Sequence, residues 1–491
     1  MKTRILIAAV AFLCAASMTS CVKMPQNRVT DASNPSATAA PGTTNPASGT
    51  SATRVESGRI PIRLSLFICC QYSTGVPPDQ TVVDDFNASQ DKIQLIRDIC
   101  CDINALAAKF ASGDGPDIVG PMGWSTADHF RDQWLDLAPL IQAANYDLTQ
   151  FNPALMKMYA TPEGQVSLPF AVNPSVVFYN TRLFAKAGLA YPPATYGEKY
   201  RMPNGSEVDW SWETVQDVAR MLTLDADGRN AAESGFNKDD IMQYGFTWQY
   251  ENHPNYWGSF WTAGTMLAPG GSPGNYTAQV PDAWKAAWEW TYNGIWGNRP
   301  FMANATVEGS PEYGSGDPFN SDKVAMAVQP SWYLCCMKDV KTWDMAAMPN
   351  YNGKVGSRVE ADAFRIWKGT KHPQEAFSVL TYLVGEAVQK LVIGSENMPA
   401  PWSTSMPARI ANQEAWLEFH KKEFPWVKNW NVLLAGLNYP DNPSADAYMP
   451  NYRDAWFRGA KFADLLRGSG GLDLNKEIET YLSDLTVIFN Q

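Results

Sequence analysis

Three side chains suited to binding a small molecule follow the ends of predicted strands. Gln71 follows a β-prone segment at 60–69, Trp124 follows another strand, and Trp332 follows a buried strand at 323–328. In an open parallel sheet, ligands bind outside the carboxyl ends of the strands. We therefore expect these three side chains to face a ligand, although each also has a plain structural interpretation.

The types of these side chains suit a sugar. A sugar ring has an apolar face of C–H groups, on which an aromatic plate packs, and a rim of hydroxyls, which planar amides and carboxylates can bind. The chain has 19 tryptophans. Trp is enriched at recognition surfaces, so it is improbable that all of them serve only the core. Trp124 and Trp332 are the strongest stacking candidates.

Catalytic motifs are missing from the sequence. The histidines His129, His253, His372 and His420 do not have the spacing of a zinc protease. No nucleophile elbow, Walker loop or dinucleotide-binding glycine motif occurs. The formal net charge of −11 disfavours nucleic acid as a partner. We expect a neutral or cationic ligand, no cofactor and no metal.

The N-terminus predicts export. Residues 1–20 have a basic start and a short apolar run, as in a secretory signal. The run ends in Met-Thr-Ser before Cys21, which resembles a bacterial lipobox with Cys21 as the lipidated residue. An ordinary signal cleaved nearby is the alternative. Residues 21–57 are rich in Ser, Thr, Ala, Pro and Gly and predict a flexible tether. We expect a lipid anchor at the cell membrane, facing the extracellular or periplasmic side.

Adjacent cysteine pairs are a second unusual feature, and each follows a predicted strand. The pairs are Cys69-Cys70, Cys100-Cys101 and Cys335-Cys336. An exported protein meets an oxidising compartment, where disulfides are expected. Three interpretations stay open: each pair closes on itself, neighbouring strand ends are cross-linked, or thiolates gather a soft metal.

The elements that position these residues alternate along the chain. A strand at 60–69, a helix near 82–87, a strand at 92–100, a helix whose face carries Ile103, Leu106 and Phe110, and a strand from 116 form a β-α-β-α-β series. Such a series predicts a parallel, doubly wound α/β sheet. Further helices are expected at 212–222 with Ser211 as its cap, at 283–290, at 373–391 and over the last 20 residues.

Short blocks in a fixed order give the chain a family resemblance. They are ASGDGPDIV at 111–119, LDLAPL at 135–140, LPF at 168–170, VFYN at 177–180, LFAKAGL at 183–189, PP at 192–193, WET at 212–214, YGF at 244–246, KVAMAV at 323–328 with SW at 331–332, and MPA at 398–400 or MPAR at 406–409. In this order they resemble the extracellular solute-binding proteins of ABC importers, in the carbohydrate-binding group similar to maltose-binding protein. An insertion at 194–211 and the cysteine pairs depart from the family pattern.

The resemblance implies an α/β, periplasmic-binding-protein-like fold with two lobes and a hinge. One lobe would hold residues 60–168 and 320–361, and the other residues 169–319 and 362–491. Crossings would lie near Phe170, near 315–320 and near Asp362. Two sets of residues would then face the cleft. The aromatic set is Trp124, Phe170, Trp248, Trp257 and Trp332, and the polar set is Gln71, Asn173, Glu251 and Asp362.

The function implied is that of a binding protein, and no enzyme activity is expected. It would be a monomer that captures a carbohydrate, such as an oligosaccharide, and delivers it to a membrane permease. A surface-anchored glycosidase is the alternative, although no acid pair is evident near the predicted cleft. An adhesin that never delivers its ligand to a transporter is a third, weaker option.

Overall fold

The computed structural model describes residues 58–66, 78–98, 103–123, 130–337, 339–394, 400–445 and 449–491. These residues belong to one compact unit. Several predictions fall outside them: the signal and tether, the lipidated Cys21, the ligand residues Gln71 and Trp124, and the cysteines Cys69, Cys70, Cys100 and Cys101.

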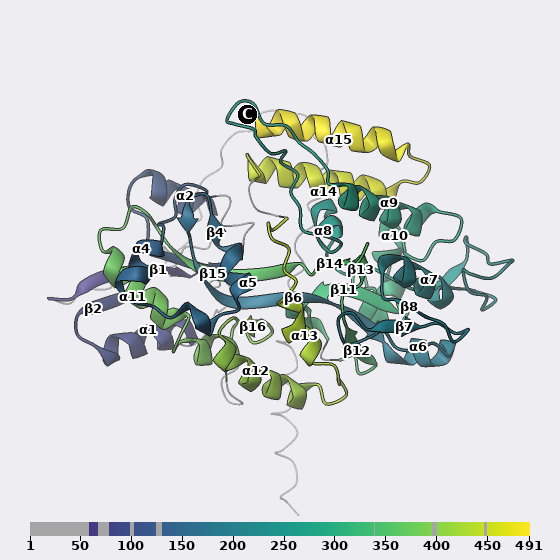
Figure 1. The fold of residues 1–491 in the computed structure, drawn as a ribbon, viewed down its shortest axis with the longest axis horizontal. Helices are drawn as coiled ribbons and strands as arrows, with labels where there is room; N and C mark the ends of the chain where they lie inside the picture. Colours follow the sequence, from purple (N-terminus) through teal and green to yellow (C-terminus); the bar gives the residue numbers. More distant parts are fainter. Residues whose placement is uncertain are drawn as a thin grey trace, which may run out of the picture. The chain divides into compact units, whose positions relative to one another are not determined.

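A mixed β-sheet of eight strands runs through the described residues (Figure 1). The strand order is β11-β6-β15-β3-β1-β2, and β12 and β16 also pair with β6. The bounds are β1 Ile60–Leu66, β2 Ile93–Asp98, β3 Ile118–Met122, β6 Leu168–Asn180, β11 Met326–Pro330, β12 Trp343–Ala346, β15 Val359–Ile366 and β16 Met406–Pro407.

The fold class predicted from the sequence is confirmed, with one difference in strand direction. β1 pairs in parallel with both β2 and β3, as the β-α-β-α-β series predicts. The long strands β6 and β15 then run antiparallel to each other, and β15 runs antiparallel to β3. The sheet is therefore mixed, because β6 and β15 add antiparallel pairings beside the parallel strands β1, β2 and β3.

Helices surround this sheet (Figure 1). They are α1 Pro78–Ser89, α2 Ile103–Ala111, α4 Ala138–Ala143, α5 Pro153–Met158, α6 Thr181–Ala187, α7 Trp212–Leu222, α8 Pro254–Ser259, α9 Asp282–Trp296, α10 Ala305–Glu308, α11 Pro373–Leu383, α12 Ile410–Glu423, α13 Asn431–Gly436, α14 Tyr452–Gly468 and α15 Leu474–Phe489. A 3-10 helix, η5, spans Ser331–Cys336, and a π-helix, η6, spans Gln389–Ile393.

Local sequence explains most of these boundaries. Ser211 caps α7, because its side chain accepts a hydrogen bond from the Thr214 amide, as predicted. The predicted helix 373–391 is wrong in its length, since α11 ends at Leu383 and η6 follows separately. The insertion 194–211 forms a small hairpin of β7 Lys199–Arg201 and β8 Glu207–Asp209.

The remaining short elements are hairpins and single turns. The hairpins are β4 Ala160–Thr161 with β5 Gly164–Gln165, β9 Leu224–Asp225 with β10 Ile241–Gln243, and β13 Asn350–Tyr351 with β14 Lys354–Val355; the 3-10 turns are η2 Leu148–Gln150, η3 Pro311–Tyr313 and η4 Phe319–Ser321.

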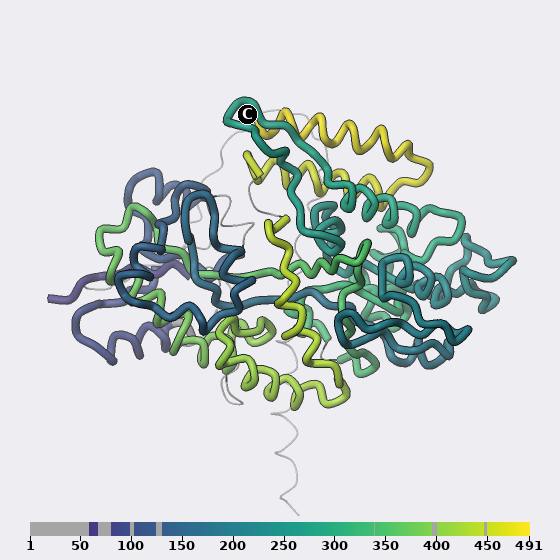
Figure 2. The backbone as a smooth tube through the Cα atoms, viewed as in Figure 1, coloured from purple at the N-terminus to yellow at the C-terminus, as the bar shows by residue number. Residues whose placement is uncertain are grey.

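Two large hydrophobic clusters form the core, and β6 contributes to both. Val176 and Phe178 belong to the first cluster, which also holds residues of β1 to β3 and of α11 to α13. Val177 and Tyr179 belong to the second, which holds residues of α6 to α9, α14 and α15. Figure 2 shows the last two helices, in yellow, beside the teal segment that contains α8 and α9. The predicted lobe boundaries stay a prediction.

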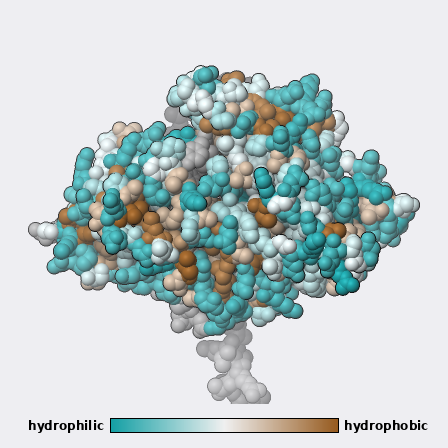
Figure 3. Space-filling view, in the orientation of Figure 1, coloured by the Kyte–Doolittle hydropathy of each residue, from teal (hydrophilic) through white to brown (hydrophobic). Residues whose placement is uncertain are grey.

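The surface is mainly hydrophilic on the face shown in Figure 3, with apolar residues scattered between polar ones. Within the described residues, no helix is both long enough and apolar enough to span a bilayer.

Candidate functional site

Two aromatic rings stack at the carboxyl end of β11. Trp332 lies on η5, which follows β11 directly, and Tyr250 reaches it from the loop before α8. The ring centroids are 6.3 Å apart and the planes differ by 21°. Tyr250 is 40% exposed, and Trp332 is partly buried. The pair therefore offers an aromatic surface at the carboxyl end of β11.

A polar network lies directly beneath this aromatic pair. Asp317 accepts hydrogen bonds from Gln249 Nε2 and from Asn320 Nδ2, and the Tyr333 hydroxyl lies 3.1 Å from its Oδ1. Burial raises the pKa of Asp317, and hydrogen bonds from Tyr250, Tyr333 and Asn320 oppose this rise. Since its oxygens accept hydrogen bonds from several protein donors, the carboxylate holds the network together.

The backbone at Tyr250 is unusual. Its φ is +63°, a region that bulky side chains rarely adopt. On one side, Gln249 bonds to Asp317 and accepts from the Phe319 amide at 3.1 Å. On the other side, Glu251 forms an ion pair with Arg358 at 3.0 Å. These contacts hold the Tyr250 ring out beside Trp332.

Polar residues of the two long strands lie close to this pair. Asn173 of β6 stands opposite Glu360 of β15, and its Oδ1 accepts from Ser331 Oγ at 3.3 Å. Ser331 immediately precedes Trp332. The predicted residues Asn173, Glu251 and Trp332 are therefore brought together around the junction of β6, β11 and β15, but Asn173 and Glu251 are only 2% and 3% exposed and lie beneath the surface.

Asp362 lies further along β15, opposite Ala171 of β6. A Cβ atom built on Gly123, at the end of β3, would be 3.5 Å from its Oδ1. Burial, and then the charge of Glu360, raise the pKa of Asp362 to about 7, against the opposing effect of Arg365. Gly123 and the long strand β15 thus meet at a carboxyl group whose pKa is raised to about 7.

Three predicted aromatic residues lie in the core instead. Phe170 is packed edge-on against Phe364, with ring centroids 4.9 Å apart. Trp248 donates to Thr291 Oγ1 at 3.0 Å, and Trp257 donates to the Glu251 carbonyl at 2.9 Å. All three are at most 4% exposed. The structure does not bring them to the surface beside Tyr250 and Trp332.

The sequence argument missed Tyr250, Tyr333, Asp317 and Asn320. Tyr250 stands only two residues after Trp248, in the aromatic stretch that follows the YGF block. The segment 315–320 was expected to be a crossing. The sequence does carry a signal for these residues, because Tyr and amide side chains cluster around the predicted tryptophans.

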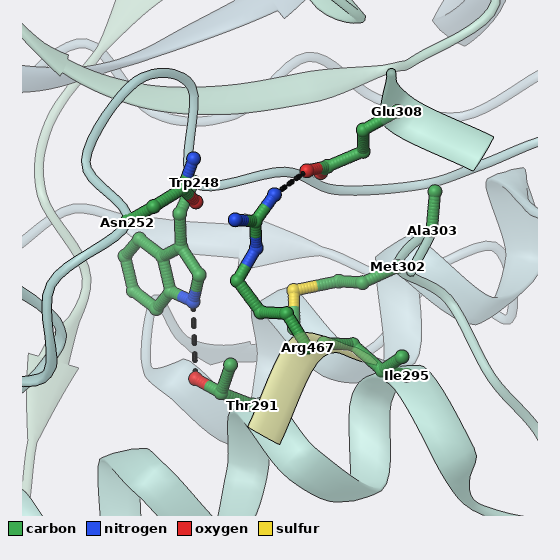
Figure 4. Close-up of a pocket in the computed structure, with 8 residues that line it drawn as sticks. All are labelled: Trp248, Asn252, Thr291, Ile295, Met302, Ala303, Glu308 and Arg467. Atoms are coloured by element: carbon green, nitrogen blue, oxygen red, sulfur yellow. Dashed lines mark hydrogen bonds and ion pairs between the residues drawn. The ribbon is translucent and has the colours of Figure 1, made fainter. Parts of the chain in front are cut away.

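A small pocket is lined in part by Trp248 (Figure 4). Its lining residues are Trp248, Asn252, Thr291, Ile295, Met302, Ala303, Glu308 and Arg467. Glu308 pairs with Arg467 and also accepts from Thr247 Oγ1 at 2.8 Å. The pocket has room for about one water molecule, so it does not suit a sugar ring.

The part of the chain that the structure describes shows neither a metal site nor a disulfide bond. There, no group of three or more His, Cys, Asp or Glu residues is placed to hold a metal ion. The sulfurs of Cys335 and Cys336 are 3.1 Å apart. A disulfide bond is about 2.05 Å long, so the structure shows two sulfurs in contact and no disulfide at this pair.

Comparison with known proteins places the chain in a family. The sequence profile described as bacterial extracellular solute-binding protein matches residues 78–390, well over half of the chain. The chain belongs to this family. A search of curated protein sequences finds no match.

Solved structures confirm the fold. M. tuberculosis UspC has 17% identity and a TM-score of 0.64, over 87% of this chain and 100% of that chain. The cyclic alpha-maltosyl-1,6-maltose binding protein from Arthrobacter globiformis has 15% identity and a TM-score of 0.59, over 88% and 100%. The sugar-binding protein MalE from Xanthomonas citri has 13% identity and a TM-score of 0.59, over 87% and 97%. The predicted periplasmic-binding-protein-like architecture is therefore correct.

Asp362 predicts a pH-dependent stability. Between the model-compound pKa of 3.8 and the folded-state pKa of about 7, the folded protein keeps a proton that the unfolded chain releases. The resulting stabilisation is complete below the lower value and is lost as the pH rises through the upper one, by at most about 1.4 kcal/mol per pH unit.

Urea unfolding from pH 4 to pH 8 measures this effect in wild type and in Asp362→Asn. The wild-type free energy of unfolding, relative to the variant, should fall up to about pH 7 and then level off. Asp239→Asn serves as the control, since that side chain is 80% exposed. A wild-type-to-variant difference that stays constant with pH would show that Asp362 does not titrate as described.

Proposed function

We propose that this protein is the carbohydrate-capturing subunit of an ABC importer, which delivers its sugar to a membrane permease. The exposed Tyr250 ring, stacked with Trp332 at the carboxyl end of β11, is the observation that carries this proposal. It provides an apolar plate of the kind that packs on a sugar ring, in a member of a family of extracellular solute-binding proteins.

The surroundings of the aromatic pair favour a neutral, hydroxyl-rich ligand. Asp317 is already bonded to Gln249, Asn320 and Tyr333. Glu251 is likewise paired with Arg358. Besides Asp317, the site therefore offers a ligand the exposed Tyr250 ring and the partly buried Trp332 and Asn320. Two of the solved structures with this fold are described as sugar-binding or maltosyl-maltose-binding proteins, which agrees with that preference.

We further propose that the ligand is enclosed by closure of two lobes about β6 and β15. The lobe bounds expected from the sequence, 60–168 with 320–361 and 169–319 with 362–491, would have to shift, because α11 to α13 share the first hydrophobic cluster with β1 to β3. The contribution of β6 to both hydrophobic clusters supports its role as a crossing strand. The closed form would be the one that the permease recognises. The binding unit would act as a monomer and would not transform its ligand.

The first residues of the sequence, which lie outside the described residues, support a proposal for how the protein is held at the membrane. We propose that Cys21 carries a lipid after removal of residues 1–20, and that residues 21–57 tether the binding unit. Such a segment of Ser, Thr, Ala, Pro and Gly buries too little apolar surface to fold by itself. It would keep capture close to the permease.

The cysteine pairs are proposed to form disulfides in the oxidising compartment outside the cell. Cys335 and Cys336 support closure of a pair on itself, since their sulfurs lie only 3.1 Å apart. Closure of a vicinal pair on itself forms a strained eight-membered ring, which is the main argument against it. Cross-linking between the 69–70 and 100–101 pairs is the competing arrangement.

A sugar-binding assay tests the main proposal. Thermal unfolding is measured with maltotriose, cellotriose, mannotriose and N-acetylglucosamine, and with spermidine and a tetrapeptide as ligands of other classes. At least one sugar should raise the Tm, because binding to the folded state alone stabilises it. A shift with spermidine or the peptide only would disprove the carbohydrate class, and cleaved sugar in the same mixtures would favour the glycosidase.

Variants of the aromatic pair locate the site. Tyr250→Ala and Trp332→Ala should each weaken binding of the shifting sugar by about 2 kcal/mol, or roughly thirtyfold in Kd by calorimetry. Phe457→Ala is the matched control, since Phe457 is 55% exposed on α14. Unchanged affinity in both site variants would move the sugar site elsewhere.

Lipidation is tested by expressing the full chain in a bacterial host. Metabolic labelling with a clickable fatty acid should label wild type and leave Cys21→Ser unlabelled, with the variant released into the soluble fraction. Label that persists in Cys21→Ser would show that this cysteine is not the acceptor.

Disulfide connectivity is tested by peptide mapping of the exported protein without reduction. The peptide holding Cys335 and Cys336 should be lighter by two hydrogens than its reduced form. A full-mass peptide that reacts with a thiol reagent would disprove closure of this pair. A peptide joining 69–70 to 100–101 would establish the cross-linked arrangement for those two pairs.

A further inference from the structure

Arg358, just before β15, bridges two carboxylates from different parts of the chain. Its Nη1 lies 3.0 Å from Glu251 Oε2, and its Nη2 lies 2.8 Å from Glu360 Oε1. Its guanidinium carbon lies 3.5 Å from the centroid of the Tyr256 ring. The side chains of Arg358 and Glu251 are each 4% exposed. One buried cation thus links the loop before α8 to the crossing strand.

The backbone of Arg358 is fixed as firmly as its side chain. Its carbonyl accepts from both the amide and the hydroxyl of Ser175, at 3.0 Å and 2.5 Å. Ser175 belongs to β6 and stands opposite Pro330 of β11. Pairing with β6 therefore fixes the backbone of Arg358, and the side chain extends from it to Glu251.

The loop that receives this contact carries the exposed aromatic ring. Tyr250 has a φ of +63° and stands between Gln249 and Glu251. A non-glycine residue keeps such a conformation only where its surroundings over-determine it. Gln249 is held by Asp317, and Glu251 is held by Arg358 through its carboxylate and by Trp257 through its carbonyl. If either flank were released, the loop could relax to an ordinary backbone conformation.

We propose that Arg358 is a positioning residue for sugar binding, which keeps Tyr250 stacked beside Trp332 and ties that pair to the crossing strand β15. This inference rests on the proposed function. Arginine suits the role because its planar fork can meet two carboxylates while its face lies on a ring. A lysine ammonium could replace the charge but not this geometry.

The variants are chosen to separate positioning from folding. Arg358→Lys keeps the charge, Arg358→Met removes it, and Glu251→Gln with Arg358→Met also removes the buried carboxylate charge that would otherwise be left alone. Arg458→Met is the matched control. Arg458 bonds Asp484 at 2.8 Å and lies 5.0 Å from the Tyr481 ring, on the terminal helices.

Two measurements are made on each variant. Calorimetry gives the Kd for the sugar that raises the wild-type Tm most among maltotriose, cellotriose, mannotriose and N-acetylglucosamine. Hydrogen exchange gives the opening of the amides of residues 249–252, which requires no ligand.

Arg358→Met should raise the Kd about tenfold, as expected if Tyr250 holds its stacked position in only about a tenth of the molecules. Exchange at 249–252 should quicken, and Arg358→Lys should show the same changes to a lesser degree. The double variant should recover Tm without recovering Kd. Arg458→Met should alter neither the Kd nor exchange at these amides.

Unchanged Kd in Arg358→Met, or full recovery of Kd in the double variant, would overturn the positioning role and leave the proposed function intact. If wild type binds none of the four sugars, the proposed function fails. In that case, hydrogen exchange still tests whether Arg358 holds the loop. Unaltered exchange at 249–252 in Arg358→Met would show that it does not.

Discussion

The register of β6 is the constraint on which the rest of the structure depends. All 13 of its residues are buried, and it pairs with β15 along its first half and with β11 and β12 along its second half. A slip of one residue would turn every side chain to the opposite face of the sheet. Val176 and Phe178 would then exchange clusters with Val177 and Tyr179. The same slip would part Asn173 from Glu360 and Ser331, so the core and the candidate site are fixed by one pairing.

Electrostatics follow from that pairing, because the buried charges gather along β15. Arg358, Glu360 and Asp362 occupy alternate positions along the chain at the start of β15. Arg358 contacts Glu251 and Glu360, and Asp362 lies near Gly123 at the end of β3. Glu251 and Glu360 share one guanidinium, whereas Asp362 has Arg365 as an opposing influence too weak to prevent its raised pKa. Arg358 thus offsets part of the carboxylate charge beside the aromatic pair, whereas burial keeps the pKa of Asp362 raised near the end of β3.

Much of the fold could be predicted from the sequence, because its signals are local. Ser211 and Glu213 mark the start of α7, and the spacing of Leu106 and Phe110 marks the buried face of α2. The site was harder to predict. The position of Tyr250 depends on Asp317 and Arg358, which lie 67 and 108 residues away: Asp317 bonds both Tyr250 and Gln249, and Arg358 holds Glu251. Trp248 and Trp257 are equally attractive by residue type, yet tertiary packing places both in the core. Residue type indicated the chemistry, and long-range contacts decided which ring reaches the surface.

The second hydrophobic cluster has a consequence for the order in which the chain folds. It joins Val177 to Phe489, and its middle is formed where Trp288 meets Phe462 and Tyr481 of the last two helices. Contacts so far apart in sequence are slow to form, because a long loop must close before they give any stabilisation. We expect this half to remain open until the C-terminal helices have been synthesised, which protease digestion of stalled chains would reveal.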